Sequence, residues 1–163
     1  METHRTTLRK PVRMDEADIL DLQQNEQVRR YLGGSIKTED FPKKFQEMIE
    51  ARPPESYWVV REKETDAFIG LVSIARHHDG IHYEVSYELH PTFWGKGYAT
   101  EIIESVIQWG FISLRLKEIY AETQKKNLAS VRLLKKVGMK RIAELERFGE
   151  TQVIYSIIST LRE

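Results

Sequence analysis

The stretch from Tyr87 to Ile103 constrains the fold of this chain more than any other part of it. It begins as an alternation of apolar and polar residues, breaks at Pro91, and passes through Gly95 and Gly97 into the apolar spacing of a helix. A strand that leads through a glycine turn into a helix points unpaired backbone N–H groups at one place, with the helix dipole behind them. The stretch therefore predicts an anion-binding cradle, and we interpret the anion as a cofactor phosphate.

The composition is that of an ordinary globular protein. The 163 residues include 25 basic and 25 acidic side chains, so no general attraction to nucleic acid or to a membrane surface is expected. There is no cysteine, which excludes disulfides, thiolate metal ligands and thiol nucleophiles. METHRTTLRK contains no apolar signal region, and no apolar run reaches membrane-spanning length. We expect one cytoplasmic domain, residues 1–163, acting as a monomer or homodimer.

The N-terminal third predicts one strand followed by three helical segments. Asp15 is placed to cap the first helix, and Gly33-Gly34 stops the second. The third begins at Thr38 or Asp40 and stops at Pro53. The expected ranges are 5–12 for the strand, 16–24 for the first helix and 28–32 for the second.

The rest of the chain predicts three strands on short turns and then alternating helices and strands. Asn127 is a good N-cap for the last helix, and Gly138 is well placed just after it. The expected strands are 57–62, 67–76, 81–90, 118–123, 139–147 and 152–160, and the expected helices are 97–114 and 128–137. The predicted class is α+β, with a mixed, mostly antiparallel sheet flanked by helices.

The glycine turn matches one known family better than the alternatives. It is not a Walker A loop, because Gly97 follows Lys96 where Ser or Thr is required, and a Rossmann fingerprint would open a βαβ unit early in the chain. The run P-T-F-W-G-K-G-Y-A-T-E, followed by N-L-A-S-V-R-L-L-K-K-V-G-M, resembles the GNAT N-acetyltransferases and, within them, the RimJ/RimL branch. Trp94, Gly97 and Ala99 occupy the positions of the family motif Q/R-x-x-G-x-G/A, with Trp94 departing from it.

This resemblance implies a GNAT fold and an acetyl-CoA site. Backbone N–H groups between Gly95 and Thr100 are expected to hold the CoA pyrophosphate, and the N–H of Leu89 to stabilise the oxyanion. The chain before the turn is expected to pair with the pantetheine arm. The expected cofactor-binding residues are Tyr87, Leu89, Trp94, Gly95, Lys96, Gly97, Tyr98, Ala99, Thr100, Asn127 and Ser130.

Two glutamates compete for the role of general base. Glu88 precedes the glycine turn, and Glu122 matches a general-base position in related N-terminal acetyltransferases. Glu84 shares a strand face with Glu88 and is a third candidate. The alternative for each is a solvated carboxylate on a strand.

The general acid of many family members is a tyrosine one turn into the last helix. Leu134 occupies that position here and cannot donate a proton. The resemblance offers Ser130 as the substitute, and we expect its hydroxyl to hydrogen-bond the CoA sulfur. A thiolate is an acceptable leaving group near neutral pH, so full proton donation is not required.

Other side chains are assigned weaker roles. His77, His78, His82 and His90 are interpreted as surface residues, because no metal-ligand spacing recurs, and no metal is expected. Tyr31 and Phe148 are candidates to line an acceptor groove. Lys125, Lys126 and Arg132 are either partners of the CoA 3′-phosphate or a solvated basic face.

The resemblance implies direct attack of a primary amine on the acetyl-CoA thioester. The first hypothesis takes a protein or peptide N-terminal α-amine as the acceptor. The second keeps the chemistry and takes a small amine, such as a polyamine or an aminoglycoside. The third is a non-catalytic acyl-CoA-binding module, which the absence of the tyrosine acid would favour.

Overall fold

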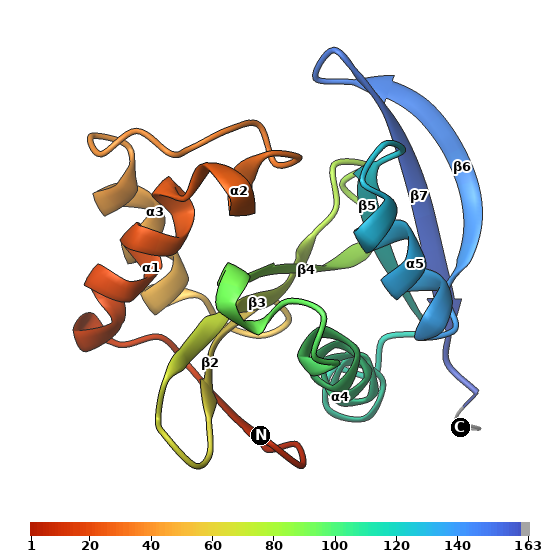
Figure 1. Ribbon diagram of the computed structural model, residues 1–163. Coiled ribbons are helices and arrows are strands. Elements are labelled where there is room, and N and C mark those ends of the chain that lie inside the picture. Colours follow the sequence, from red (N-terminus) through yellow and green to blue (C-terminus); the bar gives the residue numbers. More distant parts are fainter. Residues whose placement is uncertain (161–163) are drawn as a thin grey trace.

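The computed structural model describes residues 1–160, and within them seven strands form one mixed sheet (Figure 1). The strand order is β1-β2-β3-β4-β5-β7-β6, and every neighbouring pair is antiparallel except β4 with β5. This confirms the expected mixed, mostly antiparallel sheet. The strands are β1 (Thr6–Arg9), β2 (Ser56–Glu62), β3 (Phe68–Arg76), β4 (Tyr83–Leu89), β5 (Glu118–Gln124), β6 (Lys140–Arg147) and β7 (Glu150–Ile158).

Helices cover both faces of the sheet. The N-terminal helices lie on one face of β2–β4, while α4 and α5 lie on the other (Figure 1). In the described part of the chain no helix combines the length and apolarity needed to cross a lipid bilayer. The helices are α1 (Glu16–Gln24), α2 (Glu26–Arg29), α3 (Phe41–Glu50), α4 (Tyr98–Ser113) and α5 (Leu128–Lys136).

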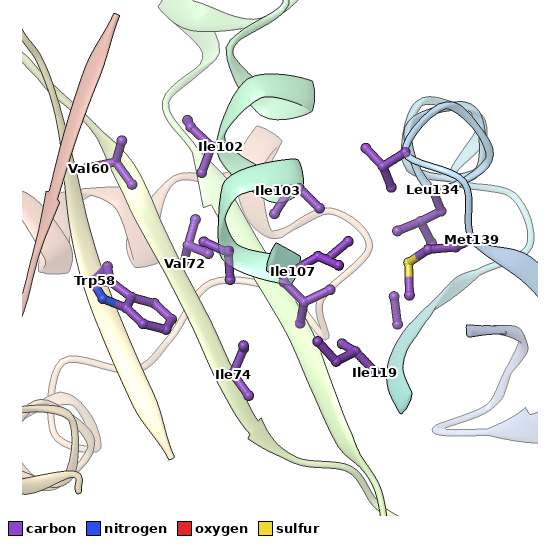
Figure 2. Close-up of a cluster of buried hydrophobic side chains, with 14 of the residues drawn as sticks. Trp58, Val60, Val72, Ile74, Ile102, Ile103, Ile107, Ile119, Leu134 and Met139 are labelled. Atoms are coloured by element: carbon purple, nitrogen blue, oxygen red, sulfur yellow. The ribbon is translucent and has the colours of Figure 1, made fainter. Parts of the chain in front are cut away.

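The main core is the layer between α4, α5 and the sheet. Figure 2 shows Ile103 and Ile107 of α4 between the strands and Leu134 of α5. A second cluster on the opposite face joins α1 and α3 to the sheet through Phe45 and Val59, both fully buried. Because burying one such side chain contributes about 1.5–3 kcal/mol, the two clusters hold the helices on opposite faces of one rigid sheet.

Asp15 does not cap α1, contrary to expectation. Its side chain makes no capping hydrogen bond and is fully buried, where Arg9 donates to both of its oxygens at 2.7 Å and Arg61 lies at 3.3 Å. Burial favours the protonated acid, but the hydrogen bonds from Arg9 and from the Val12 backbone prevail and hold the pKa of Asp15 below its usual range. Two guanidinium partners thus displace the weaker cap interaction.

Most other boundaries lie within two residues of the expected ones. The first strand is shorter than expected, and α2 begins earlier because Asn25 caps it by accepting from the N–H groups of Gln27 and Val28. Asn127 caps α5 as expected, with its Oδ1 accepting from Ser130 N at 3.2 Å.

The pairing of β4 with β5 positions the site. Within residues 1–160 these two parallel strands are in register at Glu84 and Tyr120 alone. From there toward Leu89 the strands diverge and leave a wedge-shaped gap in the sheet (Figure 1). The gap places backbone that a continuous sheet would pair beside a cavity.

Candidate active site

A cavity of about 680 Å³ occupies the gap between β4 and β5. This volume is within the range of small-molecule sites. The wall combines β4, the glycine turn, the first turn of α4, β5 and α5 with the segment around α2, so it reaches both faces of the sheet. Its lining includes Tyr31, Ser86, Tyr87, Glu88, Leu89, Trp94, Gly95, Gly97, Tyr98, Ala99, Thr100, Glu122, Asn127 and Ser130.

The backbone of β4 directs alternate groups into this cavity. His90 donates its N–H to Ile69 O at 2.8 Å, so the N–H groups of Glu88 and Ser86 also face β3 in the antiparallel ladder. Those of Leu89 and Tyr87 face the gap. The indole Nε1 of Trp94 donates to the Leu89 carbonyl at 2.8 Å on that same side. The Leu89 N–H is therefore aimed at the space between the strands.

The N-terminus of α4 forms the opposite end of the cavity. Gly95 and Gly97 have φ of +70° and +82°, a conformation that side chains with a Cβ rarely adopt. Arg5 braces this turn from outside by donating to the Lys96 carbonyl at 2.9 Å and to Glu101 Oε2 at 2.9 Å. The turn thus presents backbone N–H groups at the positive end of a 16-residue helix.

The side chains of three expected cofactor-binding residues are bonded to other parts of the protein or exposed to solvent. The side chain of Tyr98 is buried and donates to Glu62, so the hydroxyl points away from the cavity. Lys96 is exposed and absent from the lining formed by the described residues. Trp94 holds the Leu89 carbonyl through its indole N–H. Successive residues of the glycine turn and of the first helical turn point their side chains in different directions, so neighbours in the motif face different surroundings.

Tyr87 and Ser130 meet in the cavity. The Tyr87 hydroxyl lies 2.6 Å from Ser130 Oγ, joining β4 to α5. Burial raises the pKa of Tyr87 to about 12, and the Ser130 hydrogen bond only partly offsets it. Leu134 is buried in the main core. A phenolic hydroxyl is therefore present, although it comes from β4 and not from the position of the family tyrosine.

Glu88 forms an ion pair with Arg29 across the cavity wall. Arg29 Nη1 donates to Glu88 Oε1 at 2.6 Å, and the same guanidinium holds the carbonyls of Leu32 and Gly34. The other carboxylate oxygen, Oε2, is buried and has no hydrogen-bond partner. A buried carboxylate oxygen without a donor is costly, so it marks a place where a ligand N–H would be stabilised.

Glu122 is held on both of its oxygens. His77 Nε2 lies 2.5 Å from Oε2, and Arg147 Nε donates to Oε1 at 2.9 Å. The carboxylate is 7% exposed and lines the cavity. These partners come from the turn after β3 and from β6, so two other elements fix the carboxylate on β5.

Glu84 lies beside this group at the base of the gap. Burial raises the pKa of Glu84 to about 7, with the charges of His77 and Glu122 acting in opposite directions. The backbone of Glu122 acts on the Glu84 carboxylate and lowers its pKa slightly. A carboxyl group of this kind changes charge near neutral pH.

The interpretation of all histidines as surface residues is wrong for His77, whose side chain is 1% exposed. His77 lies at a turn, where side chains are usually exposed, but its side chain points inward to Glu122. No group of three His, Cys, Asp or Glu side chains in residues 1–160 is placed to hold a metal ion.

Phe148 is 74% exposed and contacts His78. Lys125 and Lys126 pair with Glu144 and Glu150, while Arg132 lines the cavity.

Sequence reasoning did not identify Arg29, His77 or Arg147 as site residues. Each is 25 to 59 positions away from its glutamate partner, and all three pairs link different elements. No local pattern marks such a pair. The only available signal was that each candidate glutamate, once buried, would require a partner.

Comparison with known proteins places this architecture in a family. Residues 5–140 match the family model of the acetyltransferase (GNAT) domain. The chain belongs to the GNAT acetyltransferase family. Uncharacterized N-acetyltransferase YoaA of Bacillus subtilis is 31% identical over 160 residues, covering 91% of this chain and 86% of that protein. Uncharacterized N-acetyltransferase YnaD of the same organism is 30% identical over 114 residues, covering 70% and 66%.

Solved structures share the GNAT fold across almost the whole chain. A GNAT-family acetyltransferase from Bacillus anthracis has a TM-score of 0.85, with 21% identity and 97% of each chain covered. Spermidine N-acetyltransferase from Vibrio cholerae, in complex with CoA and spermine, has a TM-score of 0.82 and 23% identity, with 94% of this chain and 95% of that chain covered. Ribosomal-protein-S5-alanine acetyltransferase from Vibrio fischeri has a TM-score of 0.82 and 19% identity, with 98% of this chain and 96% of that chain covered. The chain thus shares the fold of these structures along almost its whole length.

Proposed function

We propose that this GNAT domain transfers the acetyl group of acetyl-CoA to the α-amine of a peptide or protein N-terminus. One observation carries the proposal: a single cavity connects the N-terminus of α4 with two carboxylates, Glu88 and Glu122. The first end suits a pyrophosphate and the second an amine. The gap between β4 and β5 lies between them, where an extended pantetheine arm would reach from one end to the other.

The residues present fit acetyl-CoA. Backbone N–H groups from Gly95 to Thr100 bind the pyrophosphate, and Asn127 and Ser130 contact the pantetheine end. Acetyl-CoA supplies an activated thioester carbonyl. The Leu89 N–H faces the gap and donates to the carbonyl oxygen as negative charge develops on it.

Glu122 and Glu88 act on the amine. An N-terminal α-amine is partly protonated at neutral pH and must lose a proton before or during attack on the carbonyl carbon. Glu122 accepts this proton, and the unpartnered Oε2 of Glu88 accepts a hydrogen bond from the same nitrogen. As the C–S bond breaks, Ser130, hydrogen-bonded to Tyr87, donates a hydrogen bond to the departing sulfur.

The charges of the cavity favour an acceptor with one amine. Both carboxylates in its lining are already paired with arginines, Glu88 with Arg29 and Glu122 with Arg147. Three cations, Arg30, Arg132 and Lys136, also belong to the lining. A polyamine carries several positive charges and would require carboxylates without partners, because like charges repel. The resemblance to the RimJ/RimL branch points to the same acceptor.

A polyamine is the second candidate. The spermidine N-acetyltransferase of Vibrio cholerae shares the fold, and Glu84, Glu88 and Glu122 place three carboxyl groups near the gap. The unpartnered oxygen of Glu88 would serve a polyamine nitrogen equally well.

A thiol-release assay with acetyl-CoA and a panel of acceptors tests the proposal. Peptides with free N-termini are compared with the same peptides blocked by N-terminal acetylation and with spermidine. We expect release with free peptides and none above hydrolysis with the blocked ones. A higher kcat/KM for spermidine than for every peptide would replace the first candidate by the second. No release with any acceptor would refute catalysis.

A further inference from the structure

His77 connects a surface turn to the carboxylate in the cavity. It lies just after β3 and its backbone closes the turn to β4, with His77 N donating to His82 O at 2.9 Å and Gly80 N donating to His77 O at 3.0 Å. The imidazole nevertheless points inward and is 1% exposed. Its Nε2 lies 2.5 Å from Glu122 Oε2. A histidine buried in this way, bonded to a glutamate 45 positions away, is not required by the turn itself.

The other ring nitrogen fixes the tautomer. The backbone N–H of Asp79 donates to His77 Nδ1 at 3.2 Å, closer than the Asp79 Oδ2 oxygen at 3.4 Å, so we take Nδ1 as the acceptor. The proton of the neutral ring then resides on Nε2, which becomes a donor to Glu122. Asp79 is held in place because its Oδ1 accepts from the N–H groups of Ile81 and His82. The turn therefore makes the imidazole present an N–H donor to the Glu122 carboxylate.

We propose that His77 is a positioning residue for acetyl transfer, whose Nε2–H holds the Glu122 carboxylate oriented toward the acceptor amine. This inference rests on the proposed function, since it uses Glu122 as the proton acceptor. Arg147 holds the other oxygen, so the carboxylate has one donor on each side. Without His77, Oε2 would be buried without a partner and the carboxyl group would be less well oriented.

Several charged or titratable groups surround His77 and enter any pH dependence. Asp79 and His78 belong to its own turn, Glu84 lies on β4, Tyr120 and Glu122 lie on β5, and Arg147 lies on β6. His82 stacks on Tyr120 and bonds Asp79 Oδ2 at 2.6 Å. Any substitution in this turn can disturb these groups. The variants of His77 must therefore be compared with a variant of a neighbouring residue in the same turn. His78 is exposed and serves as that neighbour.

The test uses the full chain with three variants: His77→Leu, His77→Gln and the control His78→Leu. Glutamine carries an N–H donor at about the reach of Nε2 but does not titrate, so it separates positioning from proton transfer. We expect His77→Leu to lower kcat/KM for the acceptor about 10- to 100-fold, the effect of one hydrogen bond to a charged group. The dissociation constant for acetyl-CoA should not change.

The expected pattern has three further parts. His77→Gln recovers most of the lost activity, and His78→Leu behaves like the wild type. In a Glu122→Gln background His77→Leu has no additional effect. If His77→Gln is as inactive as His77→Leu while folded, or if His77→Leu is fully active, the proposal is wrong.

A measurement without turnover separates this inference from the proposed function. The ¹⁵N shifts of the His77 ring in the wild-type protein report its tautomer whether or not an acceptor is known. We expect the Nε2–H form, and a ring protonated at Nδ1 alone would overturn the proposal. A wild-type protein inactive with every acceptor would refute the proposed function, and the tautomer would then still decide whether His77 donates to Glu122.

Discussion

Single side chains in the cavity are defined by their partners more than by their own chemistry. Glu88 and Glu122 are both strand glutamates in the cavity wall, yet their surroundings differ. Glu88 has one oxygen on Arg29 and one without a donor, whereas Glu122 has a donor on each oxygen. The free oxygen suits binding of an amine, and the doubly held carboxylate suits a fixed proton acceptor.

The first prediction separates these two glutamates. We expect Glu122→Gln to lower kcat about 10²- to 10⁴-fold, the usual contribution of a general base. We expect Glu88→Gln chiefly to raise KM for the amine, since it removes a charge that contacts the substrate. Steady-state kinetics across pH measures both. The reverse pattern, a lost kcat for Glu88→Gln and a raised KM for Glu122→Gln, would exchange the two roles.

The second prediction concerns the hydroxyl pair. Tyr87→Phe removes the partner of Ser130 Oγ and should lower kcat about fivefold to tenfold, because a neutral hydrogen bond contributes about 1 kcal/mol. Tyr83→Phe is the matched control, since Tyr83 is on the same strand and bonds Arg76 at 2.7 Å outside the cavity lining. Equal kcat values for wild type and Tyr87→Phe would remove Tyr87 from the mechanism.

At the scale of elements, the cofactor end depends on how α4 begins. The helix starts directly after Gly97, and Arg5 ties that start to β1 through the Lys96 carbonyl and Glu101. Arg5 also lies over the Tyr98 ring, 4.0 Å from its centroid. The cradle is thus held from outside by the N-terminal segment, which leaves its N–H groups free to face the cavity.

The third prediction tests this cradle. Gly97→Val forces a β-branched residue to φ near +82°, which costs about 1–3 kcal/mol and should displace the N–H groups. We expect the dissociation constant for acetyl-CoA, measured by calorimetry, to rise about tenfold or more. Gly149→Val imposes similar strain at φ +73° in the β6–β7 turn and should leave that constant unchanged. Unchanged binding by Gly97→Val would contradict the cradle.

For the whole molecule, the gap in the sheet affects stability as well as chemistry. It places Glu84 in a partly buried position near Glu122, where burial raises the pKa of Glu84 from its usual 4.5 to about 7. The folded protein therefore binds this proton more tightly than the unfolded chain. Ionisation of Glu84 therefore costs stability. The free energy of unfolding falls as pH rises from about 4.5 to 7, and the loss is complete above the folded pKa.

The fourth prediction follows from that sign. Glu84→Gln removes the charge and should raise the free energy of unfolding at pH 8 by about 1–3 kcal/mol relative to wild type. At pH 4 the difference should be small. Urea unfolding at the two pH values measures it, with exposed Glu104→Gln as the control. An equal effect of Glu84→Gln at pH 4 and pH 8 would show that Glu84 has no shifted pKa.

The order and type of the elements, and the cradle itself, follow from the sequence alone. Local apolar periodicity, Asn127 as a cap and the glycines before α4 act over a few residues, so they can be read directly. The same is true of the motif by which the chain resembles its family. The range of α1 was also predicted correctly, but the capping role of Asp15 was not, because Arg9 and Arg61 bind its carboxylate instead.

Only the tertiary structure decided which side chains meet at the cavity. The pairs Arg29–Glu88, His77–Glu122 and Tyr87–Ser130 each join elements that are distant in sequence. Their formation depends on how far β4 and β5 diverge and on where α2 and α5 pack. Because burial makes an unpaired polar group costly, folding determines these pairs through three-dimensional packing, which no short-range pattern encodes.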